Sequence, residues 1–157
     1  MFTFENVPIE VVLGHPDAQP PKKAHDSDLG WDVCVVPDDE WITQENKLCY
    51  TLHPGCTKIF STGLTISVPS TYGFVLRDRS GLAAKNQIHH LAGAIEGTYR
   101  GEWKIILTNL GKESKVFYVG DKIVQALLMP IIPATVKVVD VLSETDRGMS
   151  GFGSSGR

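Results

Sequence analysis

The chain has 157 residues, which is the length of one ordinary domain and leaves no room for a second catalytic domain. Hydrophobic residues make up 42% and charged residues 21% of the sequence, as in globular proteins, which argues against a disordered, collagen-like or coiled-coil chain. Fifteen Lys and Arg against eighteen Asp and Glu give a net charge of −3. No overall positive field exists to hold nucleic acid or an anionic membrane, so an anionic ligand must be bound by a local group of residues.

The cysteines and the N-terminus indicate where the protein works. Cys34, Cys49 and Cys56 form neither a Cys-x-x-Cys pair nor an even set for disulfides. The longest apolar runs, such as residues 123–130, are far shorter than the roughly 18 to 20 residues that span a bilayer. The first residues lack the basic and apolar regions of a signal peptide. We expect a cytoplasmic protein, or one of the host cytoplasm if the source is a virus, with no membrane partner.

Short apolar and β-branched runs, broken by Gly, Pro, Asn and Asp, recur along the chain and predict an all-β domain. In chain order they cover residues 9–13, 31–36, 57–60, 64–68, 72–76, 103–108, 115–119, 123–129 and 135–141. Turn-forming sequences at 68–73 and 109–114 predict hairpin connections. Residues 80–86 have helical propensity, and residues 37–48 are interpreted as a polar loop.

The tail has a different composition from the rest of the chain. Residues 147–157 contain four glycines and three serines and have almost no side chain to bury. Such a segment is predicted to be mobile when it binds nothing. We therefore expect a single β-barrel domain over residues 1–146 and a mobile C-terminal flap over residues 147–157.

Two segments in the first half of the chain have polar groups that are unusual in a plain β-barrel. Asp32 follows a Gly-containing turn, where a carboxylate is either a local hydrogen-bond acceptor or part of a metal site. Arg79, Ser80 and Gly81 stand at a predicted strand-to-helix junction. A guanidinium, a hydroxyl and an approachable amide suit a phosphate there, and the alternative is a capping serine beside surface arginines.

Three further segments lie in the second half. Residues 93–102 place two carboxylates, a Tyr and an Arg on a Gly-rich hairpin, which is either a site or a solvated hairpin tip. Gln125 interrupts an apolar strand, so it is either a satisfied core group or a ligand contact. The Gly-rich tail could wrap phosphates with its amides, helped by the charge of Arg147 and the ring of Phe152, or could bind nothing.

The order and spacing of these five segments are specific in combination. They read Leu-Gly-Trp-Asp-Val (29–33), Arg-Ser-Gly-Leu-Ala (79–83), Gly-Ala-Ile-Glu-Gly-Thr-Tyr-Arg-Gly-Glu (93–102), Gly-Asp-Lys-Ile-Val-Gln (120–125) and Arg-Gly-Met-Ser-Gly-Phe-Gly-Ser-Ser-Gly (147–156). The chain resembles the homotrimeric dUTPases (deoxyuridine triphosphate nucleotidohydrolases), whose five motifs occur in this order. The resemblance implies a jelly-roll-like β-barrel with one short helix, a homotrimer, and Mg²⁺-assisted hydrolysis of dUTP to dUMP and pyrophosphate by attack of water on the α-phosphate.

The resemblance also implies a role for each motif residue. Those assigned to the reaction and the metal are Glu96 as base, Gln125 at the α-phosphate or its attacking water, Arg147 at the terminal phosphates, and Asp32 as a holder of Mg²⁺ through water. Those assigned to substrate binding are Arg79, Ser80 and Gly81 at the phosphates, His90, Gly93 and Ile95 at the uracil edge, Tyr99 under the deoxyribose, Phe152 over the uracil ring, and Gly153, Ser154 and Ser155 around the terminal phosphates.

The chain departs from the family pattern in three places, and two other functions are kept as alternatives. Glu96 stands where the family usually has Asp, which moves the carboxylate by about 1.5 Å. Leu29 and the pair Met149-Ser150 replace smaller residues. A dCTP deaminase, related in fold, would release ammonia from dCTP. A scaffold that meets a regulatory protein partner, with residues 37–48 as the candidate surface, would bind a protein in a pull-down.

Overall fold

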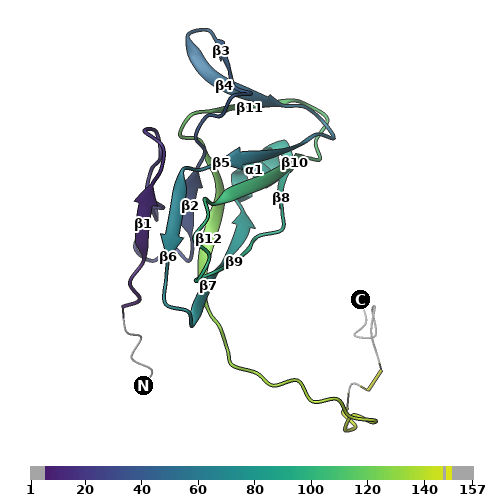
Figure 1. The fold of residues 1–157 in the computed structure, drawn as a ribbon. Helices are drawn as coiled ribbons and strands as arrows, with labels where there is room; N and C mark the ends of the chain where they lie inside the picture. The colour runs from purple at the N-terminus through teal and green to yellow at the C-terminus, as the bar shows by residue number, and fades with distance from the viewer. Residues whose placement is uncertain (1–5, 147, 150–157) are drawn as a thin grey trace.

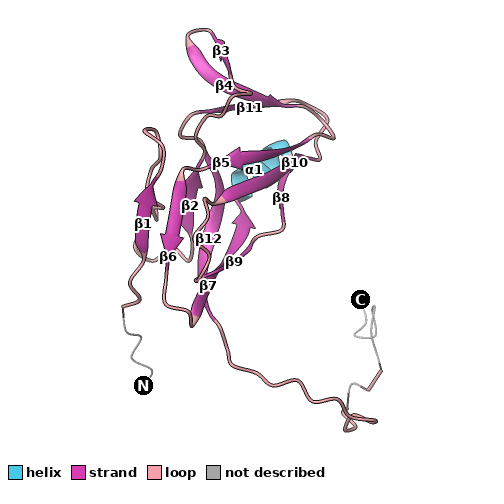
Figure 2. Ribbon diagram, viewed as in Figure 1, coloured by secondary structure: helices cyan, strands magenta, loops and turns pink. Residues whose placement is uncertain are grey.

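The computed structural model describes residues 6–146 and 148–149 and shows a nearly all-β barrel with one short helix (Figures 1 and 2). The predicted fold class is therefore confirmed. The elements are β1 (Glu10–Leu13), β2 (Trp31–Cys34), β3 (Ile42–Gln44), β4 (Lys47–Leu52), β5 (Thr57–Ser61), β6 (Leu64–Ser67), β7 (Tyr72–Asp78), α1 (Ser80–Asn86), β8 (Ile88–Leu91), β9 (Ala94–Glu96), β10 (Lys104–Asn109), β11 (Lys115–Tyr118) and β12 (Lys122–Pro130). Among the described residues, no helix is long and apolar enough to cross a membrane.

The strands form four small antiparallel sheets. Their strand orders are β1-β6, β5-β10-β8, β11-β4-β3 and β2-β12-β7-β9. The inward-facing residues of the sheets make one hydrophobic core, in which Phe60 packs on Phe117 and Phe74 packs edge-on against Trp103. Burial of these aromatic rings supplies much of the driving force for folding.

The ladder between β7 and β12 is the longest of the described strand pairings. It runs from Val124 opposite Asp78 to Pro130 opposite Tyr72. On its outer sides, β2 pairs with β12 and β9 pairs with β7, so the four strands form one sheet. This sheet carries four of the predicted site residues, Asp32, Ile95, Glu96 and Gln125, and its register fixes how far apart they lie.

The two predicted hairpins are wrong as strand pairings. Residues 68–73 connect β6 to β7, and residues 109–114 connect β10 to β11, but each pair of strands belongs to different sheets. In the second connection the buried amide of Asn109 donates hydrogen bonds to the carbonyls of Leu52 and Glu113, which fixes the crossing between sheets. Turn residues predict where the chain reverses, but tertiary packing decides which strands pair.

The predicted polar loop at residues 37–48 is also wrong in part. Strand β3 and the start of β4 form a projecting hairpin there (Figure 1). Its two turn residues, Glu45 and Asn46, have φ angles of 49° and 62°. Positive φ at both positions is the type I′ geometry that suits a two-residue hairpin. This turn usually has the sequence Asn-Gly, so the pair Glu-Asn did not predict it. Strands β8 and β9 were missed as well, since each is only three or four residues long.

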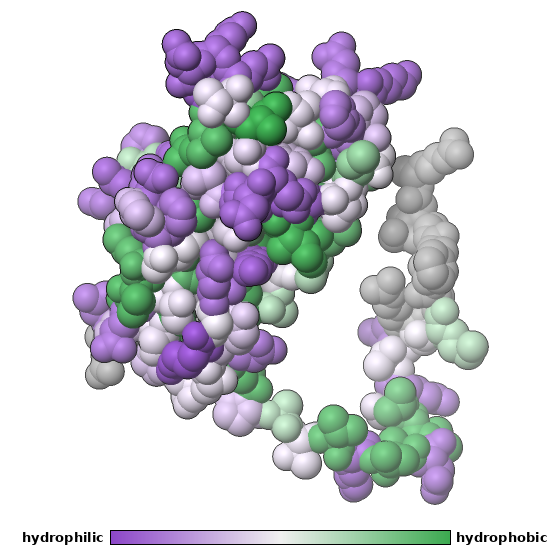
Figure 3. Space-filling view, turned by 45° about the horizontal axis from the view of Figure 1, so that its top comes forward, coloured by the Kyte–Doolittle hydropathy of each residue, from purple (hydrophilic) through white to green (hydrophobic). Residues whose placement is uncertain are grey.

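The strand predicted over residues 135–141 is wrong in this chain. Directly after β12 the Ile131 N–H donates a hydrogen bond to the Thr71 carbonyl, and the chain then leaves the barrel (Figures 1 and 3). We call residues 131–146 the C-terminal arm. Val136 and Val138 are each 92% exposed on it. The sequence has the β-branched pattern of a strand, but no described strand lies alongside to pair with it.

Candidate functional site

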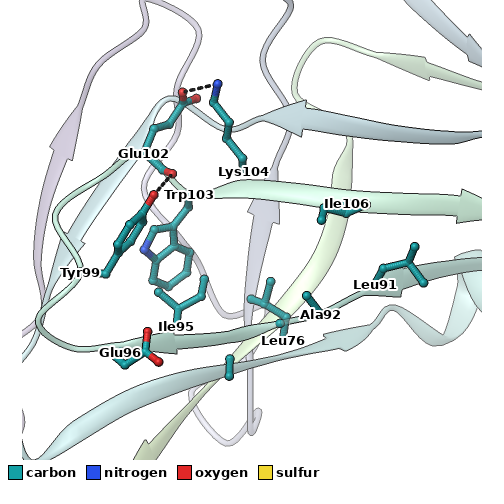
Figure 4. Close-up of a pocket in the computed structure, with 12 residues that line it drawn as sticks. Leu76, Leu91, Ala92, Ile95, Glu96, Tyr99, Glu102, Trp103, Lys104 and Ile106 are labelled. Atoms are coloured by element: carbon teal, nitrogen blue, oxygen red, sulfur yellow. Dashed lines mark hydrogen bonds and ion pairs between the residues drawn. The ribbon is translucent and has the colours of Figure 1, made fainter.

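A cavity of about 520 Å³ lies between the β8–β9 connection and the segment that leads into β10 (Figure 4). It is lined by Leu76, Leu91, Ala92, Gly93, Ala94, Ile95, Glu96, Tyr99, Glu102, Trp103, Lys104 and Ile106. Four of the predicted site residues are in this lining: Gly93, Ile95, Glu96 and Tyr99. We call this cavity the hairpin pocket.

The wall of the hairpin pocket contains two edge strands. Among the described residues, β8 has a hydrogen-bonded neighbour only in β10, and β9 only in β7. The turn between them is tight, with φ of 63° at Ala92 and 123° at Gly93, and the Gly93 carbonyl accepts a hydrogen bond from the Leu76 N–H. Each edge strand leaves backbone groups on its outer side available to a ligand, because a ladder uses only alternate groups.

Several polar residues of the 93–102 segment are used by the protein itself. The Arg100 guanidinium donates to the carbonyls of Gly97 and Tyr99 at 2.7 and 2.9 Å. The Glu102 carboxylate accepts from the N–H groups of Thr62 and Gly63 at 3.2 and 2.9 Å. Arg100 thus braces the loop internally, and Glu102 ties the loop to the barrel.

Glu96 and Tyr99 are the polar side chains of this segment that line the hairpin pocket without being tied to the barrel. The Glu96 carboxylate is exposed and makes no side-chain hydrogen bond or ion pair within the described part of the chain. Tyr99 is 46% exposed, and its hydroxyl donates a long hydrogen bond of 3.3 Å to the Glu102 carbonyl. Both side chains line the hairpin pocket (Figure 4), so the segment presents a carboxylate and a flat aromatic ring to a ligand.

Trp103 is a lining residue that the sequence analysis missed. Its ring is buried and packs on Phe74, and its indole N–H has no hydrogen-bond partner among the described residues. A buried tryptophan in an apolar strand gives no sequence signal that separates a pocket wall from ordinary core. Only the arrangement of β10 next to the β8–β9 turn shows that it forms the floor of the pocket.

The second half of the candidate site is an ion cluster on the same sheet. Asp32 is only 7% exposed, and its two carboxylate oxygens accept from the Arg79 Nε at 3.0 Å and the Lys122 Nζ at 2.7 Å. Arg79 also donates to the Lys122 carbonyl at 3.2 Å. The structure thus brings two predicted residues together and adds Lys122, which was not predicted. One carboxylate against two cations leaves a local charge of +1.

The neighbours of this ion cluster have simple roles. Gln125 is half-buried on β12, opposite Asp32 on one side and Arg77 on the other. Ser80 and Gly81 are exposed at the start of α1, directly after Arg79. Burial raises the pKa of the Cys34 thiol, so this thiol stays neutral and is not a nucleophile.

The register shows that the two halves do not meet within one chain. On β7, Gly73 lies opposite Glu96, and Arg77 lies opposite Gln125. These positions are four residues apart, which is about 13 Å along a strand, and Glu96 and Gln125 are also two strands apart. Two groups that hold one water molecule must each lie within about 3 Å of it. Glu96 and Gln125 of the same chain therefore cannot hold the same water.

The remaining predicted residues are placed as follows. His90 is not in the pocket lining: its N–H and its Nδ1 both face the Asp78 carboxylate. Leu29 is exposed, so the larger side chain displaces nothing beside Asp32 within the described chain. Arg147, Phe152, Gly153, Ser154 and Ser155 lie outside the described residues.

The comparisons with known proteins agree with this geometry. A sequence model of the dUTPase family matches residues 17–156. A deoxyuridine 5′-triphosphate nucleotidohydrolase of Clostridium tetani is 36% identical over 95% of this chain and 97% of its own length. One of Wolinella succinogenes is 35% identical over 100% of this chain and 99% of its own length.

Solved structures share the fold. The dUTPase of Staphylococcus bacteriophage 80alpha, in complex with dUPNHPP, has a TM-score of 0.79 at 24% identity and covers 96% of this chain and 99% of its own. A mutant dUTPase from phage phi11 of S. aureus, whose structure reveals the coordination of a structural Mg(II) ion, has a TM-score of 0.72 at 20% identity and covers 87% and 99%. These solved structures show the class of fold, a β-barrel shared with dUTPases. The family model and the similar sequences show that the chain belongs to the dUTPase family.

The two motif glycines differ in a way that stability can test. A Cβ at Gly97 would lie 2.3 Å from the Tyr72 carbonyl oxygen, whereas a Cβ at Gly81 would meet nothing within 4 Å. We expect Gly97→Ala to lower the free energy of unfolding in urea by about 2 kcal/mol or more, because backbone must move to make room. Gly81→Ala should leave stability unchanged or raise it by about 0.5–1 kcal/mol, since alanine favours the helix. Equal effects of the two substitutions would contradict this difference.

Proposed function

We propose that this chain hydrolyses dUTP to dUMP and pyrophosphate, with the hairpin pocket as the nucleoside site and the Asp32–Arg79–Lys122 cluster as part of the phosphate site. One observation carries the proposal. The Glu96 carboxylate and the Tyr99 ring line the pocket, whereas the side chains of Arg100 and Glu102 are hydrogen-bonded to backbone groups. Membership of the dUTPase family supplies the reaction class.

Base recognition is assigned to the edges of β8 and β9. Free backbone N–H and carbonyl groups on these edges match the alternating acceptors and donor of the uracil imide. Cytosine presents the opposite pattern at position 4 of its ring and would leave a buried group unpaired, which is a strong basis for discrimination. The tight Ala92-Gly93 turn holds the two edges beside one cavity.

Sugar recognition is assigned to Tyr99. Gly101 lies directly beneath the tyrosine hydroxyl, so the ring rests over a residue without a side chain and presents its face to the pocket. A deoxyribose on that face brings its 2′-carbon against ring carbon. A 2′-hydroxyl placed there would lose water without gaining a partner, which disfavours UTP.

The phosphate half supplies charge. The net charge of +1 on the Asp32–Arg79–Lys122 cluster attracts a triphosphate, and Ser80 and Gly81 are exposed beside it. Each Asp32 oxygen uses one of its two lone pairs in an ion pair, so one remains to accept a hydrogen bond from a water bound to Mg²⁺. The residues thus fit a magnesium ion held through water. Bound Mg²⁺ would neutralise phosphate charge and favour the departure of pyrophosphate.

The chemical step needs one proton acceptor. Glu96 takes a proton from the attacking water, whose oxygen forms a bond to the α-phosphorus while the bond to the pyrophosphate oxygen breaks. Gln125, as an amide, orients the water or the α-phosphate without changing charge. Glu96 and Gln125 can hold the same attacking water only if they come from different chains, because the sheet register separates them within one chain.

A homotrimer meets this requirement. The C-terminal arm supports an assembly of several chains, because its β-branched, alternating residues are exposed in the single chain and would be covered by pairing with a neighbouring subunit (Figure 3). The tail from Arg147 to Arg157 would then bring Phe152 and the amides of Gly153, Ser154 and Ser155 to the triphosphate. The match of the family sequence model through residue 156 includes this tail.

The direct test is pyrophosphate release from dUTP, dCTP, dTTP and UTP in the presence of Mg²⁺, with ammonia measured in parallel. The proposal predicts release from dUTP well above the other three and no ammonia. Ammonia from dCTP would instead support the deaminase alternative. Equal release from dUTP and UTP would remove Tyr99 from the proposed role.

Glu96→Gln is the sharpest single variant. It keeps size and hydrogen bonding but cannot accept a proton, so kcat should fall by about 10² to 10⁴ while the binding of a non-hydrolysable dUTP analogue is retained. Glu113→Gln is the matched control, because Glu113 is exposed in the β10–β11 connection and should leave kcat unchanged. A Glu96→Gln enzyme with normal kcat would exclude Glu96 as the base.

The arm gives a separate prediction on assembly. Val136→Asp combined with Val138→Asp places two charges where the arm would be covered by another subunit. We therefore expect light scattering to show that the variant trimer dissociates at a higher protein concentration than the trimer of the unmodified protein. Val12→Asp, on the exposed edge of β1, is the control. An unchanged trimer in the double variant would show that the arm does not hold the subunits together.

A further inference from the structure

One cluster of chemically active side chains lies outside both halves of the site. Asp78 ends β7, and His89 and His90 lie on β8. The Nδ1 atom of His89 lies 2.7 Å from one Asp78 carboxylate oxygen, and the Nδ1 atom of His90 lies 2.5 Å from the other. One carboxylate oxygen and these two ring nitrogens all lie within 4.8 Å of one another, so the three residues aim their ligating atoms at one point.

The cluster has a fixed base and an open side. The His90 side chain is 9% exposed, and its backbone N–H also donates to the Asp78 carboxylate at 2.8 Å, which holds residue and carboxylate together. The Asp78 and His89 side chains are 28% and 47% exposed. The cluster therefore has three protein groups on one side and solvent on the other. A metal site with three protein ligands and an open coordination position for water has this arrangement.

The charge state of the cluster suits a cation. Burial raises the pKa of the Asp78 carboxyl, but hydrogen bonds from His89, His90 and the His90 N–H outweigh burial and lower it, so the carboxylate is ionised. Of the two arginines that flank Asp78, Arg79 is committed to Asp32 and the Lys122 carbonyl, and Arg77 forms no ion pair with Asp78 among the described residues. The two histidine rings are the side chains that contact the Asp78 carboxylate in the described part of the chain.

We propose that Asp78, His89 and His90 form a binding site for a divalent transition-metal ion such as Zn²⁺, distinct from the Mg²⁺ proposed at the phosphates. Two imidazole nitrogens and one carboxylate oxygen are preferred ligands of Zn²⁺ and Co²⁺, whereas Mg²⁺ prefers oxygen ligands. The carboxylate and the exposed His89 ring need only small rotations to exchange their hydrogen bond for bonds to the ion. The site lies beside the hairpin pocket, because the His90 ring packs against Gly93.

The test is a calorimetric titration of the untagged, full-length protein with Zn²⁺ in excess Mg²⁺. We expect one Zn²⁺ per chain, visible absorption bands typical of nitrogen-ligated Co²⁺ when cobalt is used instead, and a rise in Tm on addition of Zn²⁺. His89→Ala should weaken Zn²⁺ binding by about tenfold or more and remove the Tm rise. Asp78→Asn should have the same effect. If Asp78→Asn does not fold, the result for His89→Ala tests the proposal, because His89 is half exposed and its removal should leave the fold intact.

His53 provides the matched control. It is an exposed histidine, hydrogen-bonded to Ser114 and three residues before the exposed Cys56, so it is the natural place for adventitious metal binding. His53→Ala should leave Zn²⁺ affinity unchanged. The proposal is overturned if Zn²⁺ does not bind, if His89→Ala binds as tightly as the unmodified protein, or if binding is lost in His53→Ala.

Discussion

The antiparallel ladder between β7 and β12 is the constraint on which the rest of the site depends. It sets Asp32, Gln125 and Arg77 in one row across the sheet and places Glu96 four residues further along β7, on the opposite edge. A shift of one residue in this ladder would move every side chain to the other face, so the buried core locks the register. The distance between the two halves of the site is therefore a property of the core rather than of flexible loops.

This constraint is the reason for proposing a site shared between chains instead of one complete site in each chain. The hairpin pocket holds a carboxylate and an aromatic ring but lacks the arginine and glutamine of the phosphate half. The Asp32–Arg79–Lys122 cluster has charge for phosphates but no free base. In the homotrimer that we propose, each half would lie against its complement from another chain, and cyclic symmetry would repeat the same contact at every site.

The side chains of residues 93–102 have two different roles. Arg100 donates to carbonyls of its own loop, and Glu102 accepts from backbone N–H groups of the barrel, so both side chains shape the loop. A side chain at position 97 would collide with a backbone carbonyl, so this position requires glycine. A side chain at position 81 would meet no atom of the described part of this chain, so packing does not require glycine there. Some motif residues therefore fix the shape of the loop, and others are exposed by the loop to the hairpin pocket.

The sequence predicted the class of fold, the helix at residues 80–86 and most strands of the central sheet, because alternating burial is encoded locally by β7 and β12. The motif spacing also predicted residues that the structure places together, namely Asp32 with Arg79 in the ion cluster, and Glu96 with Tyr99 in the hairpin pocket. The sequence could not predict that residues 68–73 join different sheets, or that Lys122 neutralises Asp32, because both depend on contacts between distant segments. The strand expected at 135–141 failed because no described strand of this chain lies alongside to pair with it.

The most direct test of a site shared between chains is complementation of two inactive variants. Glu96→Gln and Gln125→Ala are produced together in equal amounts, and mixed trimers are confirmed by native mass spectrometry. If each site takes Glu96 from one subunit and Gln125 from another, each residue is intact half of the time, and about one quarter of the unmodified activity should return. If the mixed trimers remain as inactive as either variant alone, the two residues serve one site within one chain, and the account is wrong.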